Sequence, residues 1–209
     1  MTLSVRLAVP FMLLALSAMP AGALAAPKLT NSSFRGDVAE AAFFVTDGCN
    51  GSVVGISASD GSSNDRATGR QRGASVRVNV VSFDICIGST LHEISADVEL
   101  VAGQFSVDSG LAMAALQASV PGYDQITGQP TVLDLRVTWT ATSTASMTRS
   151  IEMVTLPDGT RELTRADGQQ REATATGTVS GNGFVFVAGT AALADVQSVR
   201  DGSLLRSSR

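Results

Sequence analysis

Apolar and polar residues alternate with a period of two through most of the chain. The clearest case is Leu133, Leu135, Val137 and Trp139, which alternate with polar residues. Successive side chains of a strand point to opposite faces of a sheet, so this period predicts strands with one buried and one solvated face. About ten such segments lie between residues 38 and 199. The alanine-rich segment 111–120 could also form a helix, but its period of two favours a strand.

Turn residues separate these segments. Examples are Asp47-Gly48, Pro157-Asp158-Gly159 and Gly181-Asn182-Gly183, and residues 60–73 are rich enough in Gly, Ser, Asn and Asp to predict a long hairpin loop. Short antiparallel strands at this spacing form sandwiches or barrels. We predict an all-β fold, an antiparallel β-sandwich of about ten strands without significant helix, as a single domain over residues 37–202.

One strand has an irregular pattern. Val76, Val78 and Val80 share one face, whereas Val81 begins a second apolar series of the opposite phase. A β-bulge at Val80/Val81 would place both series on the same face, opposite Val54. We therefore predict a bulge there.

The N-terminus predicts export. A basic Arg6 precedes the apolar residues 7–18, and Ala23-Leu24-Ala25 places small residues where a signal peptidase cleaves. Residues 1–25 are therefore predicted to be a signal peptide, and the mature protein to be secreted or periplasmic. Residues 26–36 are predicted to be a flexible lead-in and residues 203–209 a frayed tail.

Two cysteines in an exported chain predict one disulfide, Cys49–Cys86. Antiparallel partners have residue numbers with a constant sum, and pairing Val54 with Val81 gives 135, which is also the sum for the two cysteines. The cysteines should then face each other at one end of the strand pair.

The charge balance limits the possible partners. The chain has 15 basic and 19 acidic residues, and without Arg6 the balance is 14 minus 19, or −5. Arginines are scattered along the sequence without a basic cluster. This argues against nucleic acid and against attraction to anionic membranes. No transmembrane segment is predicted in the mature chain.

Candidate catalytic residues are few. His92 is the only histidine, so a multi-histidine metal site is excluded, and we expect it on the solvated or edge side of a strand start. Asp97 and Glu99 share a strand face, at roughly 7 Å by strand rise, and are the carboxylates a hydrolase would use. That spacing is common on solvated strands, and we predict that the protein is not an enzyme.

Candidate binding residues lie in two loops. Asp60, Asn64 and Asp65 are weak calcium candidates, but without the alternating acidic pattern of a calcium loop we expect no metal and no cofactor. Tyr123 and Asp124, in the loop region 121–130, are possible ligand-binding residues, because an exposed tyrosine can stack on a sugar.

Four segments carry a resemblance to known proteins: 43–49 through Asp47-Gly48-Cys49, 83–89 with Phe83-Asp84-Ile85-Cys86, 135–142 through Trp139, and 173–180. Together they resemble exported bacterial β-sandwich proteins with no assigned activity. The resemblance implies a fold and an extracytoplasmic location, but no mechanism.

These observations leave several functions open. The first is a non-catalytic secreted or envelope-associated protein with an interaction or structural role. The second is a small-ligand or carbohydrate-binding module that uses loops 60–73 and 121–130, and the third is a carboxylate-based hydrolase. A protein or a glycan is the expected partner.

Overall fold

The computed structural model describes residues 29–66, 68–181 and 184–207, and these residues form β-strands and their connections without any helix. No segment of this part of the chain is a helix with the length and apolar character needed to cross a bilayer. The all-β prediction is confirmed, with eleven strands instead of about ten. The predicted signal peptide, residues 1–25, lies outside the described residues. The strands are β1 (Leu29–Asp47), β2 (Asn50–Asp65), β3 (Gly69–Asp84), β4 (Ser89–Leu100), β5 (Phe105–Val107), β6 (Met113–Asp124), β7 (Gln129–Ala141), β8 (Ser146–Thr155), β9 (Arg161–Gly181), β10 (Phe184–Thr190) and β11 (Leu193–Ser207).

All strands belong to one antiparallel sheet whose ladders return to their starting point. From β1 the pairing runs through β2, β3, β4, β6, β7, β9 and β11 back to β1. The long β9 connects the parts, because β7 and β8 follow each other along one of its edges while β10 and β11 follow each other along the other. The weakest link is between β4 and β6, which share only the pairs Ile94–Asp124 and Ser95–Tyr123.

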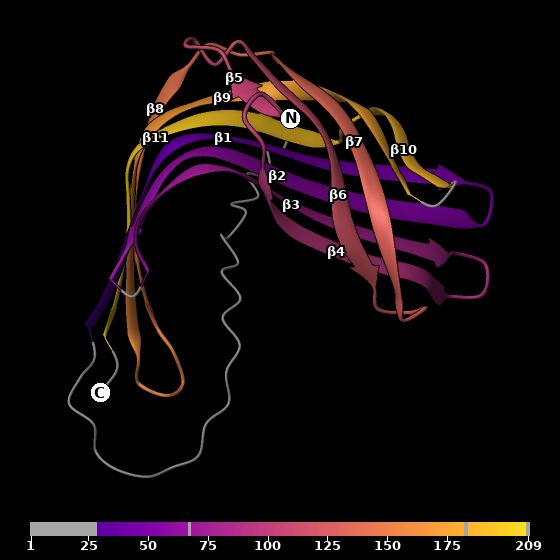
Figure 1. The fold of residues 1–209 in the computed structure, drawn as a ribbon, viewed down its shortest axis with the longest axis horizontal. Helices are drawn as coiled ribbons and strands as arrows, with labels where there is room; N and C mark the ends of the chain where they lie inside the picture. Colours follow the sequence, from indigo (N-terminus) through magenta and orange to yellow (C-terminus); the bar gives the residue numbers. More distant parts are fainter. Residues whose placement is uncertain (1–28, 67, 182–183, 208–209) are drawn as a thin grey trace, which may run out of the picture.

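The apolar core lies between two parts of this sheet. Figure 1 shows β6 and β7 crossing the row formed by β1 to β4, an arrangement consistent with the predicted sandwich. Trp139 on β7 is fully buried, and its Nε1 donates a hydrogen bond to the carbonyl oxygen of Glu40 on β1, at 2.8 Å. The predicted series Leu133, Leu135, Val137 and Trp139 is buried as expected. We call the part of the molecule around this core the body.

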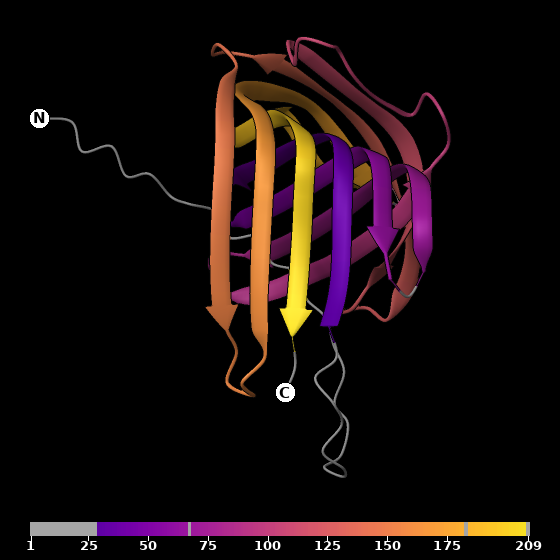
Figure 2. The ribbon, with the colours of Figure 1, turned by 90° about the vertical axis from the view of Figure 1, so that its left-hand side faces the viewer.

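One end of each of five strands, β1, β2, β3, β9 and β11, extends away from the body. Together with all of β8, these ends form a single layer, which we call the arm (Figures 1 and 2). None of the buried core residues belongs to the arm. Backbone hydrogen bonds between its strands, more than apolar packing, therefore hold it together. It consists of residues 29–36, 61–65, 69–73, 146–155, 161–170 and 199–207.

A row of glycines marks the boundary where the sheet bends from the body into the arm. Gly36 pairs with Gly61, and Gly61 pairs with Gly73, while on the other side Gly36 pairs with Val199 and Val199 with Gly168. A Cβ on Gly36 would lie 2.2 Å from the carbonyl oxygen of Asp60, and one on Gly168 would lie 2.0 Å from that of Ser198. The bend thus depends on glycines that let adjacent backbones approach closely.

The disulfide Cys49–Cys86 is confirmed, with its Cα atoms 5.2 Å apart. It joins the turn between β1 and β2 to the turn between β3 and β4. The register used to predict it was wrong by one residue, because Val54 pairs with Val80. The cysteines lie in the two turns just beyond the last paired residues, Asn50 and Asp84, where the N–H of Ile85 also donates a hydrogen bond to the carbonyl oxygen of Cys49.

The predicted bulge at Val80/Val81 is also wrong. The β2–β3 ladder is regular throughout, and the irregularity falls between Ser82 and Phe83, in the ladder with β4. Val81 and Phe83 instead lie on the outer face. The absence of a side chain at Gly51 leaves room for the Phe83 ring, which would lie 2.4 Å from a Cβ at that position.

Three segments predicted to be irregular are strands. Within the predicted loop, residues 60–65 end β2 and residues 69–73 begin β3. Residues 29–36 of the predicted lead-in begin β1, and residues 203–207 of the predicted tail end β11. All three lie in the arm. Their composition resembled loops because a strand without an apolar core needs no alternating apolar residues.

Gly36→Ala should destabilise the protein by about 2–3 kcal/mol, because its Cβ would overlap the backbone of Asp60. Gly55→Ala on the same sheet is the matched control, since a Cβ there meets nothing within 4 Å. That control should be neutral or stabilise by up to about 1 kcal/mol. Urea unfolding at neutral pH measures both changes, and equal effects would contradict the role of the glycine row.

Candidate ligand-binding face of the arm

Seven arginines that are far apart in the sequence lie on one face of the arm. In an antiparallel ladder, directly paired residues share a face. Arg35 pairs with Ser62, and Ser62 pairs with Arg72; Ser33 pairs with Asn64, and Asn64 with Arg70. Because the other arm strands continue the same ladder, we call this surface the arginine face. Its arginines are Arg35, Arg70, Arg72, Arg149, Arg161, Arg165 and Arg200.

Arg200 reaches this face through a bulge. The ladders of β11 with β1 and with β9 both shift register here, between Val199 and Asp201, so Arg200 is an extra residue without a direct partner on β9. Bulges redirect side chains next to binding sites. Here the bulge lies at the glycine row and places Arg200 near Arg35.

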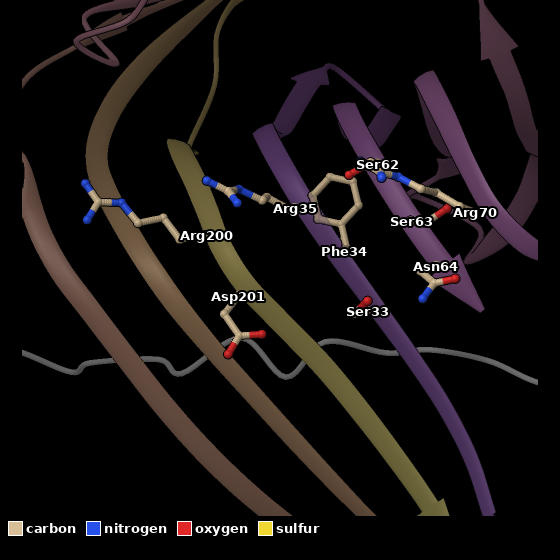
Figure 3. Close-up of a pocket in the computed structure, with 9 residues that line it drawn as sticks. All are labelled: Ser33, Phe34, Arg35, Ser62, Ser63, Asn64, Arg70, Arg200 and Asp201. Atoms are coloured by element: carbon tan, nitrogen blue, oxygen red, sulfur yellow. The ribbon is translucent and has the colours of Figure 1, made fainter. Parts of the chain in front are cut away.

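A shallow groove of about 320 Å³ runs across this face where the arm meets the body. Figure 3 shows side chains from β1, β2, β3 and β11 around it, with guanidinium groups on both sides of β1. It is lined by Ser33, Phe34, Arg35, Ser62, Ser63, Asn64, Arg70, Arg200 and Asp201.

The groove has more positive than negative charge available. Its single carboxylate, Asp201, lies 3.6 Å from the Nε of Arg165. Among the residues that the structure describes, no ion pair involves Arg35, Arg70 or Arg200. These three guanidinium groups, together with serine hydroxyls and an asparagine amide, form a donor-rich surface suited to a carboxylate, sulfate or phosphate.

An acidic pair borders the groove on the body side. Asp37 pairs with Asp60 across β1 and β2. Burial raises the pKa of the Asp37 carboxyl, the hydrogen bond with Ser198 partly offsets this, and the charge of Asp60 raises it further. The groove therefore has two carboxyl groups bordering its body end, next to the arginines.

The opposite face of the arm has the reverse charge. It carries Asp65, Glu152 and Glu162 against a single arginine, Arg206, whose Nε lies 3.2 Å from the Glu162 carboxylate. Charges are thus separated between the two faces of one layer. The sequence expectation that no basic cluster exists is wrong, because the register brings together arginines from five strands, β1, β3, β8, β9 and β11. The sequence feature that could have predicted this clustering is the spacing of two residues between Arg70 and Arg72, which places both side chains on the same face of a strand.

The calcium candidates do not come together. Asp60 and Asn64 are four residues apart on one strand face, about 13 Å by strand rise, and Asp65 is on the other face. Within the described part of the chain, the only group of possible metal ligands is Cys49, Asp84 and Cys86, in which both thiols are used by the disulfide.

The two loops proposed for carbohydrate binding are also separate. The β2–β3 hairpin lies at the arm, whereas the turn after β6 lies at the far side of the body (Figure 1). Tyr123 is exposed there, on the outer surface, but Asp124 is buried. They therefore do not form one site with residues 60–73.

Asp124 stabilises the short β4–β6 pairing, the weakest link of the sheet, which we call the seam. Its carboxylate accepts hydrogen bonds from His92 Nδ1 at 2.8 Å, Thr127 Oγ1 at 2.8 Å, and the backbone N–H groups of Glu93 and Ile126. Burial alone would raise the pKa of Asp124, but these four hydrogen bonds outweigh it and lower the pKa well below its usual range. The carboxylate therefore ties β4 to β6 and has little capacity left for a ligand.

His92 was expected on the solvated or edge side of a strand start, and the structure places it near the start of β4 on the inner side of the sheet. Its ring centroid is 5.6 Å from that of Phe184 and 6.1 Å from that of Phe186. Ser82 pairs with His92 across β3 and β4 and is buried, so a serine, a histidine and an aspartate are close together. In the described structure, however, no hydrogen bond reaches the Ser82 hydroxyl, so the serine is not activated as in a hydrolytic triad.

The carboxylates considered for hydrolysis lie on the outer face of β4. Asp97 accepts a hydrogen bond from the Arg77 guanidinium at 2.6 Å, and both side chains are more than half exposed. Glu99 is exposed opposite Ser75. The pair forms part of the solvated surface.

Comparisons with protein-family models, with curated proteins and with solved structures find no match to this chain. The resemblance to exported bacterial β-sandwich proteins therefore stays a prediction.

Asp124→Asn should lower the free energy of unfolding at pH 7 by about 2 kcal/mol, because a buried amide cannot accept all four hydrogen bonds. The lowered pKa of Asp124 in the folded state gives stability that is fully present above the unfolded value of about 3.9 and is lost as the pH falls below it. The difference between wild type and variant should therefore shrink from pH 5 to pH 2.

Urea unfolding at several pH values measures this difference. Asp134→Asn is the control, since Asp134 is exposed on β7, and it should change stability by less than about 0.5 kcal/mol. A difference for Asp124→Asn that stays constant with pH would show that the ionised carboxylate does not stabilise the seam.

Proposed function

We propose that this chain is an exported, non-catalytic binding protein that holds an anionic ligand on the arginine face. The observation that carries the proposal is the groove in which Arg35, Arg70 and Arg200 have no ion-pair partner among the described residues. Planar guanidinium groups bind carboxylate, sulfate and phosphate through paired hydrogen bonds.

The arrangement favours binding over catalysis. The groove is shallow and open, and its side chains are mostly hydrogen-bond donors. Its one carboxylate, Asp201, lies beside Arg165. Such a surface can hold a charged group but offers no paired acid and base.

The disulfide supports a location outside the cytoplasm, because disulfides persist in oxidising compartments. The signal peptide predicted for residues 1–25 agrees with this location. Export also brings the protein into contact with the acidic polymers and headgroups of a cell surface.

Arg35→Ala/Arg70→Ala should weaken binding to dextran sulfate at least tenfold, because each lost charged hydrogen bond costs about 1.5 kcal/mol. Isothermal titration calorimetry in 20 mM and 200 mM NaCl measures the affinity, with neutral dextran as the ligand control. Binding should weaken at the higher salt concentration, because salt screens exposed charges.

The matched protein control is Arg77→Ala/Arg136→Ala, which removes the same charge from exposed positions on β3 and β7 of the body. This control should bind within about twofold of wild type. Absence of binding to dextran sulfate, or an equal loss in both double variants, would contradict the proposal.

A further inference from the structure

Exposed apolar side chains share the arginine face. Met147, Ile151 and Met153 on β8 alternate with Arg149, and all three are more than 60% exposed. Met153 pairs with Leu163 on β9, and Leu163 with Leu205 on β11, which gives an apolar row across three strands. We call the five residues Met147, Ile151, Met153, Leu163 and Leu205 the apolar row.

Arginines and apolar residues interleave on this face. Ile151 pairs with Arg165, and Arg161 and Arg165 flank Leu163 at period two. A soluble protein gains nothing from exposing these methyl and thioether groups to water, and exposed apolar patches mark interaction sites. Their location beside guanidinium groups restricts the chemistry of the partner.

We propose that the arginine face docks on a lipid bilayer that contains anionic headgroups, an inference that rests on the proposed anion binding and names its source. Guanidinium groups would pair with headgroup phosphates, while the apolar row enters the boundary between headgroups and acyl chains. The charge distribution of the arm supports docking on anionic headgroups. Arginines outnumber Asp167 and Asp201 on this face, while Glu152 and Glu162 lie on the other face.

A soluble acidic polymer as the ligand would account for the arginines of this face but not for its exposed apolar residues. It would pair with the arginines but would leave the apolar row in water. The row also extends along β8, whose ten residues are all exposed and which is separated from the groove-lining strand β11 by β9. A broad bilayer can contact both regions at once, whereas a ligand confined to the groove contacts only one.

The test is co-sedimentation of the purified protein with large unilamellar vesicles. Vesicles of phosphatidylcholine with 30% phosphatidylglycerol should bind the protein, and pure phosphatidylcholine vesicles should bind at least tenfold more weakly. Met147→Ser/Ile151→Ser/Met153→Ser should lower vesicle binding at least tenfold and leave the affinity for dextran sulfate unchanged. Arg35→Ala/Arg70→Ala should lower both.

The control for lost apolar surface is Met113→Ser/Ile126→Ser/Val132→Ser, which changes three residues of similar exposure on the body. It should bind vesicles as wild type does, and circular dichroism checks that both triple variants are folded. Binding to dextran sulfate without binding to anionic vesicles would overturn the lipid inference and leave the proposed function in place. Equal vesicle binding by the two triple variants would also overturn it, and loss of all anion binding would overturn both proposals.

Discussion

Close approach of backbones at the glycine row is the constraint on which the architecture depends. Five strands, β1, β2, β3, β9 and β11, cross the boundary between body and arm without a break, so the bend must be accommodated within paired strands. Side chains on Gly36 or Gly168 would overlap the backbone of the neighbouring strand. The arm, the bulge at Arg200 and the groove all follow from this row.

The body depends on a second and more local interaction. The β4–β6 seam has two residue pairs. The buried carboxylate of Asp124 adds two hydrogen bonds across it, from His92 and the Glu93 N–H, and accepts two more from the turn that follows β6. A charged group at this point is costly to bury, so it stabilises the seam only with all its partners in place. This explains why a residue in a loop-like segment is among the most buried polar groups described.

The sequence predicted the body well because a core imposes a pattern. Leu133 to Trp139 had to alternate in order to bury one face, and the two cysteines of the chain had one possible pairing. The arm was missed for the same physical reason. Its strands bury no core, so glycines needed for the bend and polar residues on exposed faces had the composition of loops. Arg35, Arg70 and Arg165 could be placed together only after the register was known.

The uninterrupted strands also have a mechanical consequence. Five continuous, hydrogen-bonded strands join arm and body, so they transmit any force or orientation imposed at one end to the other. The disulfide-linked turns lie at the opposite end of these strands from the arm (Figure 1). If the arm is bound to a surface, the body is therefore held rigidly relative to that surface. The turns around Cys49 and Cys86 then lie at a fixed distance from the surface and in a fixed orientation.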